Sequence, residues 1–244
     1  TSARGAARAS LRADDVRLVP EGLHFTLAEG GENHAVASPL LGRFNVENLL
    51  AVAGTLRALG WSLADVAAML PRLSPVGGRM SRVGGQGGRP LVVVDYAHTP
   101  DAISHAFTAL RSQAAVRGGR LWCVLGCGGD RDPGKRPLMA SVAEKGADQV
   151  VLTSDNPRSE SPEAILAAML TGLTRPQQAR TQADRALAIA EVVAQAAAQD
   201  VVLVAGKGHE TTQEIMGVFH PYSDESQVVS ALKLRFACLD GGGQ

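Results

Sequence analysis

Charged and glycine-rich segments follow directly after four apolar runs of this sequence. These polar segments are Asp95–Asp101, Gly126–Arg136, Asp155–Arg158 and Gly206–Glu210. Within them, Arg131 and Arg158 can each bind a carboxylate through two parallel hydrogen bonds. The side chains of Asp155, Asn156 and Glu210 can accept hydrogen bonds from an ammonium group. Together, these groups would bind a small ligand that carries both carboxylate and amine, such as an amino acid with several charged centres.

Each polar segment also has a simpler explanation when it is taken alone. The glycines of Gly126–Gly129 would be needed for a tight turn even without a ligand, and the charges of Asp130–Arg136 would form a solvated surface cluster. His98 and His209 follow apolar runs among carboxylates, which favours functional roles for both. Asp200 is interpreted as an ordinary surface charge.

Two of the cysteines, Cys123 and Cys127, lie close together in one apolar run. A metal site would need further thiol or histidine ligands nearby, and the surrounding sequence offers none. We therefore interpret both as core cysteines and expect no metal site in this chain.

Composition narrows the classes of partner. The chain has 244 residues, and its 24 Lys and Arg balance its 24 Asp and Glu. A net charge of zero removes the electrostatic case for a nucleic-acid or membrane-surface partner. No apolar run approaches the ~18 residues of a membrane span, and residues 1–15 lack the apolar core of a secretory signal. Three cysteines do not make a disulfide framework, so we expect a cytoplasmic protein.

The four apolar runs predict strands that are buried on both faces. They are Leu91–Val94, Leu121–Leu125, Gln149–Thr153 and Val201–Ala205. Helical stretches separate them, at about 100–115, 135–147, 162–173 and 184–198. Strands and helices that alternate at this spacing predict βαβ units around a mostly parallel sheet. Ligands bind beyond the carboxyl ends of the strands in such a sheet, which is where the polar segments fall.

The N-terminal third of the sequence has a different pattern. Val16–Leu27 predicts a β-hairpin that turns at Pro20-Glu-Gly22. Two helices follow, at about 45–59 and 62–70. A cluster of proline and glycine at 75–78 predicts a boundary. The resulting domains are 1–74 and 75–244.

Six motifs resemble those of the Mur ligase family and occur in the same order. They are Gly42–Asn48, Gly78–Met80, Asp95–Asp101, Leu121–Asp132, Asp155–Arg158 and Ala205–Glu210. The resemblance covers about residues 35 to 235 and is to the C-terminal part of the members that add diaminopimelate. It implies an α/β architecture, in which a Rossmann-like, mostly parallel sheet domain at 75–244 binds the amino acid. Residues 1–74 would be the α+β closing part of the central ATP-binding domain.

The resemblance implies an amide-bond-forming ligase of peptidoglycan synthesis. Such a ligase uses ATP and Mg²⁺ to activate the D-glutamyl carboxylate of UDP-MurNAc-L-Ala-D-Glu as an acyl phosphate, which the amine of meso-diaminopimelate then attacks. The segment Asp155–Arg158 implies diaminopimelate rather than lysine, because Arg158 supplies a cation for the distal carboxylate that lysine lacks. A buried arginine left unpaired would disfavour lysine.

The roles of individual residues follow from the same motifs. The residues implied to bind meso-diaminopimelate are Arg131, Asp155, Asn156, Pro157, Arg158, Gly206 and Glu210. The residues implied on the nucleotide side of the cleft are Asn45, Asn48, Arg79 and Asp95. Catalytic roles are implied for His98 and Lys135. The expected partners are small-molecule substrates and not nucleic acid or membrane, and members of the family are usually monomeric.

One departure from the family pattern is large. The phosphate-binding pattern Gly-x-x-x-x-Gly-Lys-[Ser/Thr] is absent from all 244 residues, as are the metal-binding acid, the histidine and the carbamylated lysine of the central domain. The main ligands of ATP and Mg²⁺ are therefore expected outside this sequence, and the chain alone is expected to be inactive. Two alternatives stay open: a non-catalytic diaminopimelate-binding module, and a ligase of the folylpolyglutamate synthase type. The segments Gly126–Asp132 and Asp155–Arg158 disfavour the second alternative.

Overall fold

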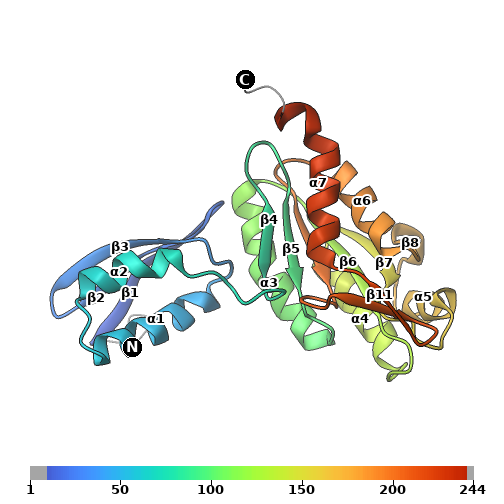
Figure 1. The fold of residues 1–244 in the computed structure, drawn as a ribbon, viewed down its shortest axis with the longest axis horizontal. Helices are drawn as coiled ribbons and strands as arrows, with labels where there is room; N and C mark the ends of the chain where they lie inside the picture. The colour runs from blue at the N-terminus through green and yellow to red at the C-terminus, as the bar shows by residue number, and fades with distance from the viewer. Residues whose placement is uncertain (1–9, 241–244) are drawn as a thin grey trace. The chain divides into compact units, whose positions relative to one another are not determined.

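The chain folds into two compact units, of which one ends at Pro75 and the other begins at Val76 (Figure 1). The structure is a computed structural model, and it describes residues 10–240. Residues 1–9, which include most of the N-terminal segment considered above, and residues 241–244 lie outside the described part. No helix among the described residues has the length and apolar composition needed to cross a bilayer.

The first unit is a three-stranded antiparallel sheet with two helices. The strands are β1 (Leu11–Val19), β2 (Gly22–Glu29) and β3 (Glu32–Ser38), in the order β1-β2-β3. The helices are α1 (Phe44–Ala58) and α2 (Leu63–Met69), followed by a 3-10 turn, η1 (Leu70–Arg72). Pairing of β1 with β2 confirms the predicted hairpin. Apolar side chains of the sheet and both helices form one core, and the Ser62 hydroxyl caps α2 by accepting a hydrogen bond from the Asp65 N–H.

A six-stranded sheet forms the centre of the second unit. Its strands are, in spatial order, β4 (Ser81–Gly84), β5 (Leu91–Asp95), β9 (Val201–Ala205), β6 (Leu121–Cys127), β7 (Gln149–Ser154) and β8 (Arg180–Gln182). The edge strand β4 is antiparallel to β5, whereas all the other pairs are parallel. Every residue of β5, β6 and β9 is buried, as the apolar runs predict. The expected α/β class with a mostly parallel sheet is therefore confirmed.

Helices cover both faces of this sheet (Figure 1). One face carries α3 (Pro100–Arg117), α4 (Lys135–Gly146) and α5 (Pro162–Leu170), and the other carries α6 (Arg185–Gln195) and α7 (Asp224–Asp240). The remaining elements are a 3-10 turn, η2 (Pro176–Gln178), and a hairpin of β10 (Thr212–Ile215) and β11 (Val218–Pro221). Side chains of Thr99, Ser161 and Asp184 cap the first turns of α3, α5 and α6.

The order of the strands brings the polar segments to one edge of the sheet. Asp95 at the end of β5 lies opposite Ala205 of β9, and Leu125 of β6 lies opposite the same residue. Cys127 of β6 lies opposite Ser154 of β7. Because these four strands are parallel, the segments that follow them all leave the sheet at its carboxyl edge.

Asp200 is a structural residue and not the surface charge that the sequence suggested. It is 2% exposed, and its carboxylate accepts hydrogen bonds from Trp122 Nε1 at 2.8 Å, the Arg120 N–H at 2.8 Å and the Ala197 N–H at 2.9 Å. These bonds join the start of β9 to the start of β6. The expectation was wrong because two of the three donors lie about 80 residues away in the sequence.

Candidate functional site

A cavity of about 480 Å³ lies at the carboxyl edge of the sheet. Its lining includes the expected site residues His98, Arg131, Lys135, Asp155, Asn156, Arg158, Gly206 and Glu210. All of them belong to the second unit, and they come from the segments that follow β5, β6, β7 and β9. Pro157 is buried but does not line the cavity.

Asp155 presents a nearly buried carboxylate to this cavity. Its exposed fraction is 8%, and within residues 10–240 no donor forms a hydrogen bond with its side chain. Burial raises the pKa of Asp155, and the cations of Arg185 and Lys207 offset only part of that effect. A cationic ligand would supply the partner that this carboxylate lacks.

Gly206 allows Asp155 to occupy its position. Its φ is +119°, and a Cβ atom there would lie 2.5 Å from Asp155 Oδ2. Any larger residue would therefore be strained in its backbone and would displace the carboxylate. Glycine is required at this point of the cavity wall.

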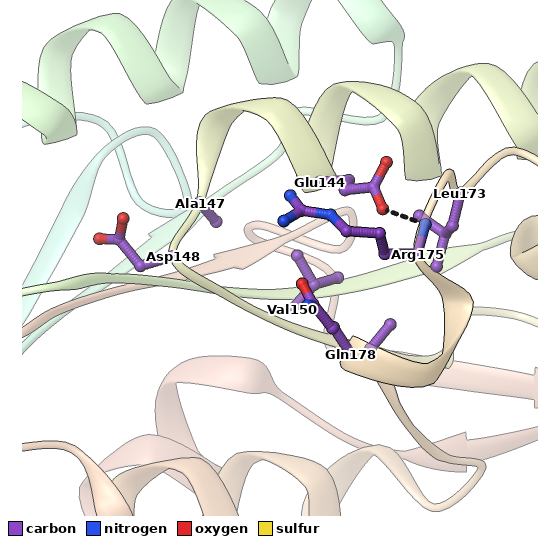
Figure 2. A pocket seen from close by; sticks show the side chains of 8 residues that line it. Glu144, Ala147, Asp148, Val150, Leu173, Arg175 and Gln178 are labelled. Atoms are coloured by element: carbon purple, nitrogen blue, oxygen red, sulfur yellow. Dashed lines mark hydrogen bonds between the residues drawn. The ribbon is translucent and has the colours of Figure 1, made fainter.

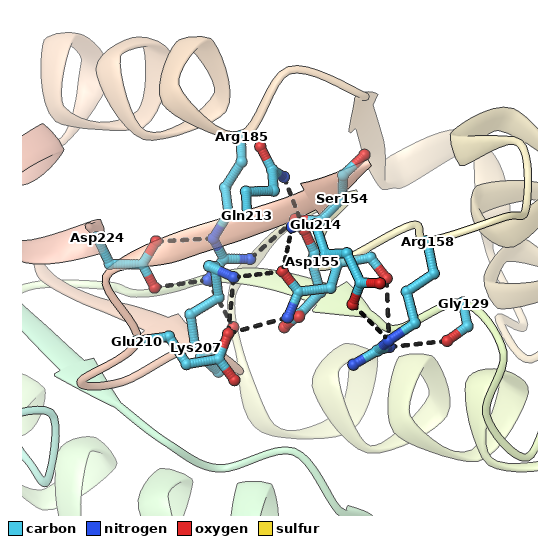
Figure 3. Close-up of polar contacts among 12 residues, drawn as sticks. Gly129, Ser154, Asp155, Arg158, Arg185, Lys207, Glu210, Gln213, Glu214 and Asp224 are labelled. Carbon is cyan, nitrogen blue, oxygen red and sulfur yellow. Dashed lines mark hydrogen bonds and ion pairs between the residues drawn. The ribbon is translucent and has the colours of Figure 1, made fainter. Parts of the chain in front are cut away.

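A hydrogen-bonded network fixes Asn156 and Glu210 (Figure 3). Asn156 Oδ1 accepts from Lys207 Nζ at 2.8 Å and from the Glu214 N–H at 3.0 Å, and Asn156 Nδ2 donates to Glu210 Oε2 at 2.9 Å. The amide oxygen is thus fully used, so Asn156 can offer only an N–H to a ligand. This corrects the expectation that Asn156 accepts a hydrogen bond from the ammonium group of a ligand, because the ammonium group that it accepts from is that of Lys207.

Arg158 is held from two sides at the rim of the cavity (Figure 3). Its Nε lies 3.1 Å from Glu214 Oε2, and its Nη1 donates to the Gly129 carbonyl at 2.8 Å. The backbone at Arg158 has φ of 53° and is hydrogen-bonded to Glu214 of β10 and to Met216, the residue after that strand. Arg158 therefore presents a cation in one orientation, whereas Arg131 is exposed and forms no ion pair among residues 10–240.

A second ion pair joins two of the loops around the cavity. Arg136 Nη2 and Nη1 lie 2.7 and 2.8 Å from the two oxygens of Glu160, and Nη2 also donates to the Gly128 carbonyl. The Asp130 N–H donates to Glu160 Oε1 at 2.6 Å. The loop after β6, which carries Arg131, is therefore attached to the loop after β7, and the simple solvated cluster considered for 130–136 is excluded for Arg136.

The two expected catalytic residues line the cavity on its exposed side. His98 Nδ1 lies 2.7 Å from the Tyr96 carbonyl. A carbonyl can only accept, so Nδ1 carries the hydrogen and Nε2 of the neutral ring is left as an acceptor. Lys135 is exposed at the first turn of α4. Their catalytic roles stay predictions.

The residues expected on the nucleotide side are divided between the two units. Asn45 and Asn48 lie on α1 of the first unit, where Asn48 Nδ2 donates to Asn45 Oδ1 at 2.9 Å. In the second unit, the Arg79 guanidinium lies 4.9 Å from the centre of the Tyr96 ring. Both oxygens of Asp95 accept backbone hydrogen bonds, from Met80 and Ala97. Asp95 thereby joins the residue before β4 to the segment after β5, and its role toward a nucleotide stays a prediction.

The cysteines are core residues, as predicted. Cys123 is fully buried and Cys127 is 5% exposed, and burial raises the pKa of each thiol to about 12. Neutral thiols of this kind are poor metal ligands. In the part of the chain that the structure describes, no group of three His, Cys, Asp or Glu side chains could hold a metal ion.

A smaller cavity, of about 50 Å³, lies near the amino ends of β7 and β8 (Figure 2). Of its two acidic residues, Asp148 accepts hydrogen bonds from Arg111 Nη1 and the Leu121 N–H, and Glu144 accepts them from the Thr174 N–H, the Thr174 hydroxyl and the Arg175 N–H. These bonds lower the pKa of Glu144. The group acts as a cap for the chain that leads into β8, so we assign no ligand to this cavity.

Three residues with clear roles at the site were missed by the sequence analysis: Lys207, Glu214 and Arg136. Lys207 lies within a motif that was singled out, but its complete burial leaves no trace in the local sequence. Glu214 belongs to a hairpin that the apolar pattern does not indicate. Arg136 was treated as one charge in a basic loop, although its partner Glu160 lies 24 residues away.

Comparisons with known proteins agree with this arrangement. Residues 78–208 match the family model described as Mur ligase, glutamate ligase domain. The chain is 53% identical over 231 residues to UDP-N-acetylmuramoyl-L-alanyl-D-glutamate--2,6-diaminopimelate ligase of Xanthomonas campestris pv. campestris (strain 8004). The aligned region covers 95% of this chain and 46% of that protein. A solved structure with the same name has a TM-score of 0.78 at 42% identity, covering 95% of this chain and 47% of the other.

The folylpolyglutamate synthase alternative rests on fold alone. A synthase of this type from Mycobacterium tuberculosis has a TM-score of 0.59 at 23% identity, covering 82% of this chain and 46% of that one. This chain spans less than half the length of these relatives. The family match, in contrast, covers more than half of the chain and includes most of the cavity. By its fold, by its ordered motifs and by this match, the chain belongs to the Mur ligase family.

Proposed function

We propose that this chain is the amino-acid-binding part of a ligase that adds meso-diaminopimelate to UDP-MurNAc-L-Ala-D-Glu through an acyl phosphate in peptidoglycan precursor synthesis. The observation that carries the proposal is one cavity whose lining includes the arginines Arg131 and Arg158 and the carboxylates Asp155 and Glu210. The name of the relative that shares 53% identity with the chain supports the same substrate.

The arrangement suits a ligand with charges of both signs at each end. The Arg158 guanidinium and the free N–H of Asn156 would bind the distal carboxylate of diaminopimelate, and Asp155 and Glu210 would bind an ammonium group. Arg131, on the exposed loop, would supply the second cation. Lysine lacks the distal carboxylate and would forgo the contact with Arg158, which would keep only its partners within the chain, Glu214 and Gly129, so the site would discriminate against lysine.

ATP and Mg²⁺ belong to the reaction of the whole ligase and do not fit the described residues as a complete site. No metal-binding group of three side chains is present among residues 10–240, and both oxygens of Asp95 are occupied by backbone donors. The chain alone would therefore hold the amino acid without turning over ATP. The proposal places the reaction in the cytoplasm.

The proposal is tested by calorimetric titration of this chain with meso-diaminopimelate and, as a control, with L-lysine. Binding of meso-diaminopimelate alone is expected. Equal binding of the two ligands would contradict the selective role of Arg158. If neither ligand bound, the assignment of the cavity in this chain would be wrong.

The variant Asp155→Asn is expected to bind meso-diaminopimelate more weakly and to lose a pH dependence that the wild type shows. The pKa of Asp155 is raised, so its carboxylate is protonated as the pH falls toward that pKa, and the attraction for an ammonium group is lost. Titrations at several pH values, with the exposed Asp101→Asn as a control, would measure both effects.

The same variant is not expected to destabilise the free protein at neutral pH. Because the folded state holds the Asp155 proton more tightly than the unfolded state, this group contributes less stability as the pH rises through its raised pKa, and asparagine removes that cost. Urea unfolding at neutral pH would show it. Unchanged affinity in Asp155→Asn would contradict the role given to Asp155.

A further inference from the structure

We propose that Lys207 is a positioning residue of the amino-acid cavity: it does not touch the ligand but holds Glu210 and Asn156 in the orientation that the ligand requires. The inference rests on the proposed function of the cavity, and it assigns a role to a side chain that does not line the cavity wall.

Lys207 is a completely buried lysine. Its exposed fraction is 0%, and its Nζ donates to Asn156 Oδ1 and to Glu210 Oε2, each at 2.8 Å. The ring of Tyr222 lies 5.9 Å from the same nitrogen. Burying an ammonium group costs free energy unless partners compensate it, and an apolar side chain of similar volume would often serve stability as well. The charge of Lys207 therefore calls for a role beyond packing.

The contacts of Lys207 determine what the cavity offers to a ligand (Figure 3). Glu210 Oε2 receives hydrogen bonds from both Lys207 and Asn156, which leaves Oε1 as the free acceptor. Asn156 has its oxygen turned toward Lys207 and cannot flip, because a flipped amide would place its NH₂ group against an ammonium. The wall is thereby fixed as one acceptor next to one donor.

The charges and hydrogen bonds around Glu210 also indicate that Lys207 acts on this carboxylate. Burial alone would raise the pKa of this carboxyl, but the hydrogen bonds from Lys207 and Asn156 and the charges of Lys207 and Arg158 lower it below its ordinary value. The negative charge of Glu210 in turn contributes to the raised pKa of Asp155, another carboxylate of the wall. Removing the Lys207 ammonium should raise the pKa of Glu210.

The test compares Lys207→Met with the wild type, and uses Lys233→Met as a matched control because Lys233 is an exposed lysine on α7. Titration with meso-diaminopimelate at neutral pH, at a temperature where thermal melts show each variant folded, is expected to give about 30-fold weaker binding for Lys207→Met. Lys233→Met should bind as the wild type does. Carbon-13 NMR titration of the Glu210 carboxyl should show a higher pKa in Lys207→Met.

A double variant tests whether Lys207 acts through Glu210. In a Glu210→Gln background, Lys207→Met should cost much less affinity than it does in the wild type, because the group that it orients has lost its charge. Lys207→Gln, which keeps a donor at this place, should retain part of the affinity, and it replaces Lys207→Met if that variant does not fold.

Two results would overturn the inference. One is an affinity within about threefold of the wild type in Lys207→Met, which would leave Lys207 with a purely structural role. The other is an unchanged titration of Glu210. If the wild type itself did not bind meso-diaminopimelate, the proposed function would fail, and the titration of Glu210 in the free chain would still decide the role of Lys207.

Discussion

Arg158→Met is expected to weaken binding of meso-diaminopimelate by about 100-fold, because a charge-assisted contact with the distal carboxylate is lost. L-lysine has no such carboxylate, so its affinity should stay the same or rise when this cation is removed. The variant should therefore reduce or abolish the preference between the two ligands. Calorimetric titration of the wild type and the variant with both ligands measures that preference directly.

The control for this experiment is Arg175→Met, which removes an exposed arginine beside the smaller cavity. It should change neither affinity. Arg158→Met also leaves Glu214 without its ion-pair partner, so thermal unfolding has to be measured alongside. Equal losses for both ligands would show that Arg158 supports the cavity wall without selecting the ligand.

Asp224→Asn is expected to destabilise the second unit by about 3–5 kcal/mol, because it leaves the buried Arg185 cation uncompensated. Both side chains are 0% exposed, and Arg185 Nε and Nη2 lie 2.7 and 2.8 Å from the two Asp224 oxygens. The same guanidinium donates to the Ser154 and Ala205 carbonyls (Figure 3). It thus ties α6 and α7 to the carboxyl ends of β7 and β9. A drop of roughly 10 °C in the melting temperature would correspond to this loss.

The stability of the double variant Arg185→Met/Asp224→Leu should be compared with that of Asp224→Asn. It removes both charges together, so it should recover a large part of the stability lost in Asp224→Asn. Urea unfolding of the single and double variants gives the coupling free energy between the two sites. If Asp224→Asn unfolded at the same urea concentration as the wild type, the pair would not hold these elements together.

The central strands could be predicted from the sequence, whereas the outer strands could not. β5, β6, β7 and β9 are nearly continuous apolar runs because helices cover both of their faces. β8 has only three residues, Arg180–Gln182, all of them polar, and β10 and β11 have four each and are half-buried or exposed. Strands this short form because they pair with neighbouring strands, so their positions cannot be predicted from the local sequence pattern.

The sequence also indicated which loops form the site but not how their side chains are used. An asparagine side chain can both donate and accept hydrogen bonds. The use of each end of Asn156 is decided by partners more than 50 residues later in the sequence, among them Lys207. Arg185 stands at the start of a helix, where a charge is ordinarily solvated, and its burial depends on Asp224, 39 residues further on. Burial of a charge is a property of tertiary contacts, so it is not visible in a window of sequence.

The position of β9 has a consequence for the order in which the domain can assemble during synthesis. This strand is the last of the parallel strands in the chain, yet it lies between β5 and β6, which are earlier and do not pair with each other. A nascent chain that ends before Val201 therefore carries two half-sheets with a gap between them. Contacts of such long sequence separation form late and slow the folding of a domain. Strand β9 therefore completes the sheet by joining β5 to β6. We expect the loops around the cavity to reach their final positions only after residues 201–205 have left the ribosome.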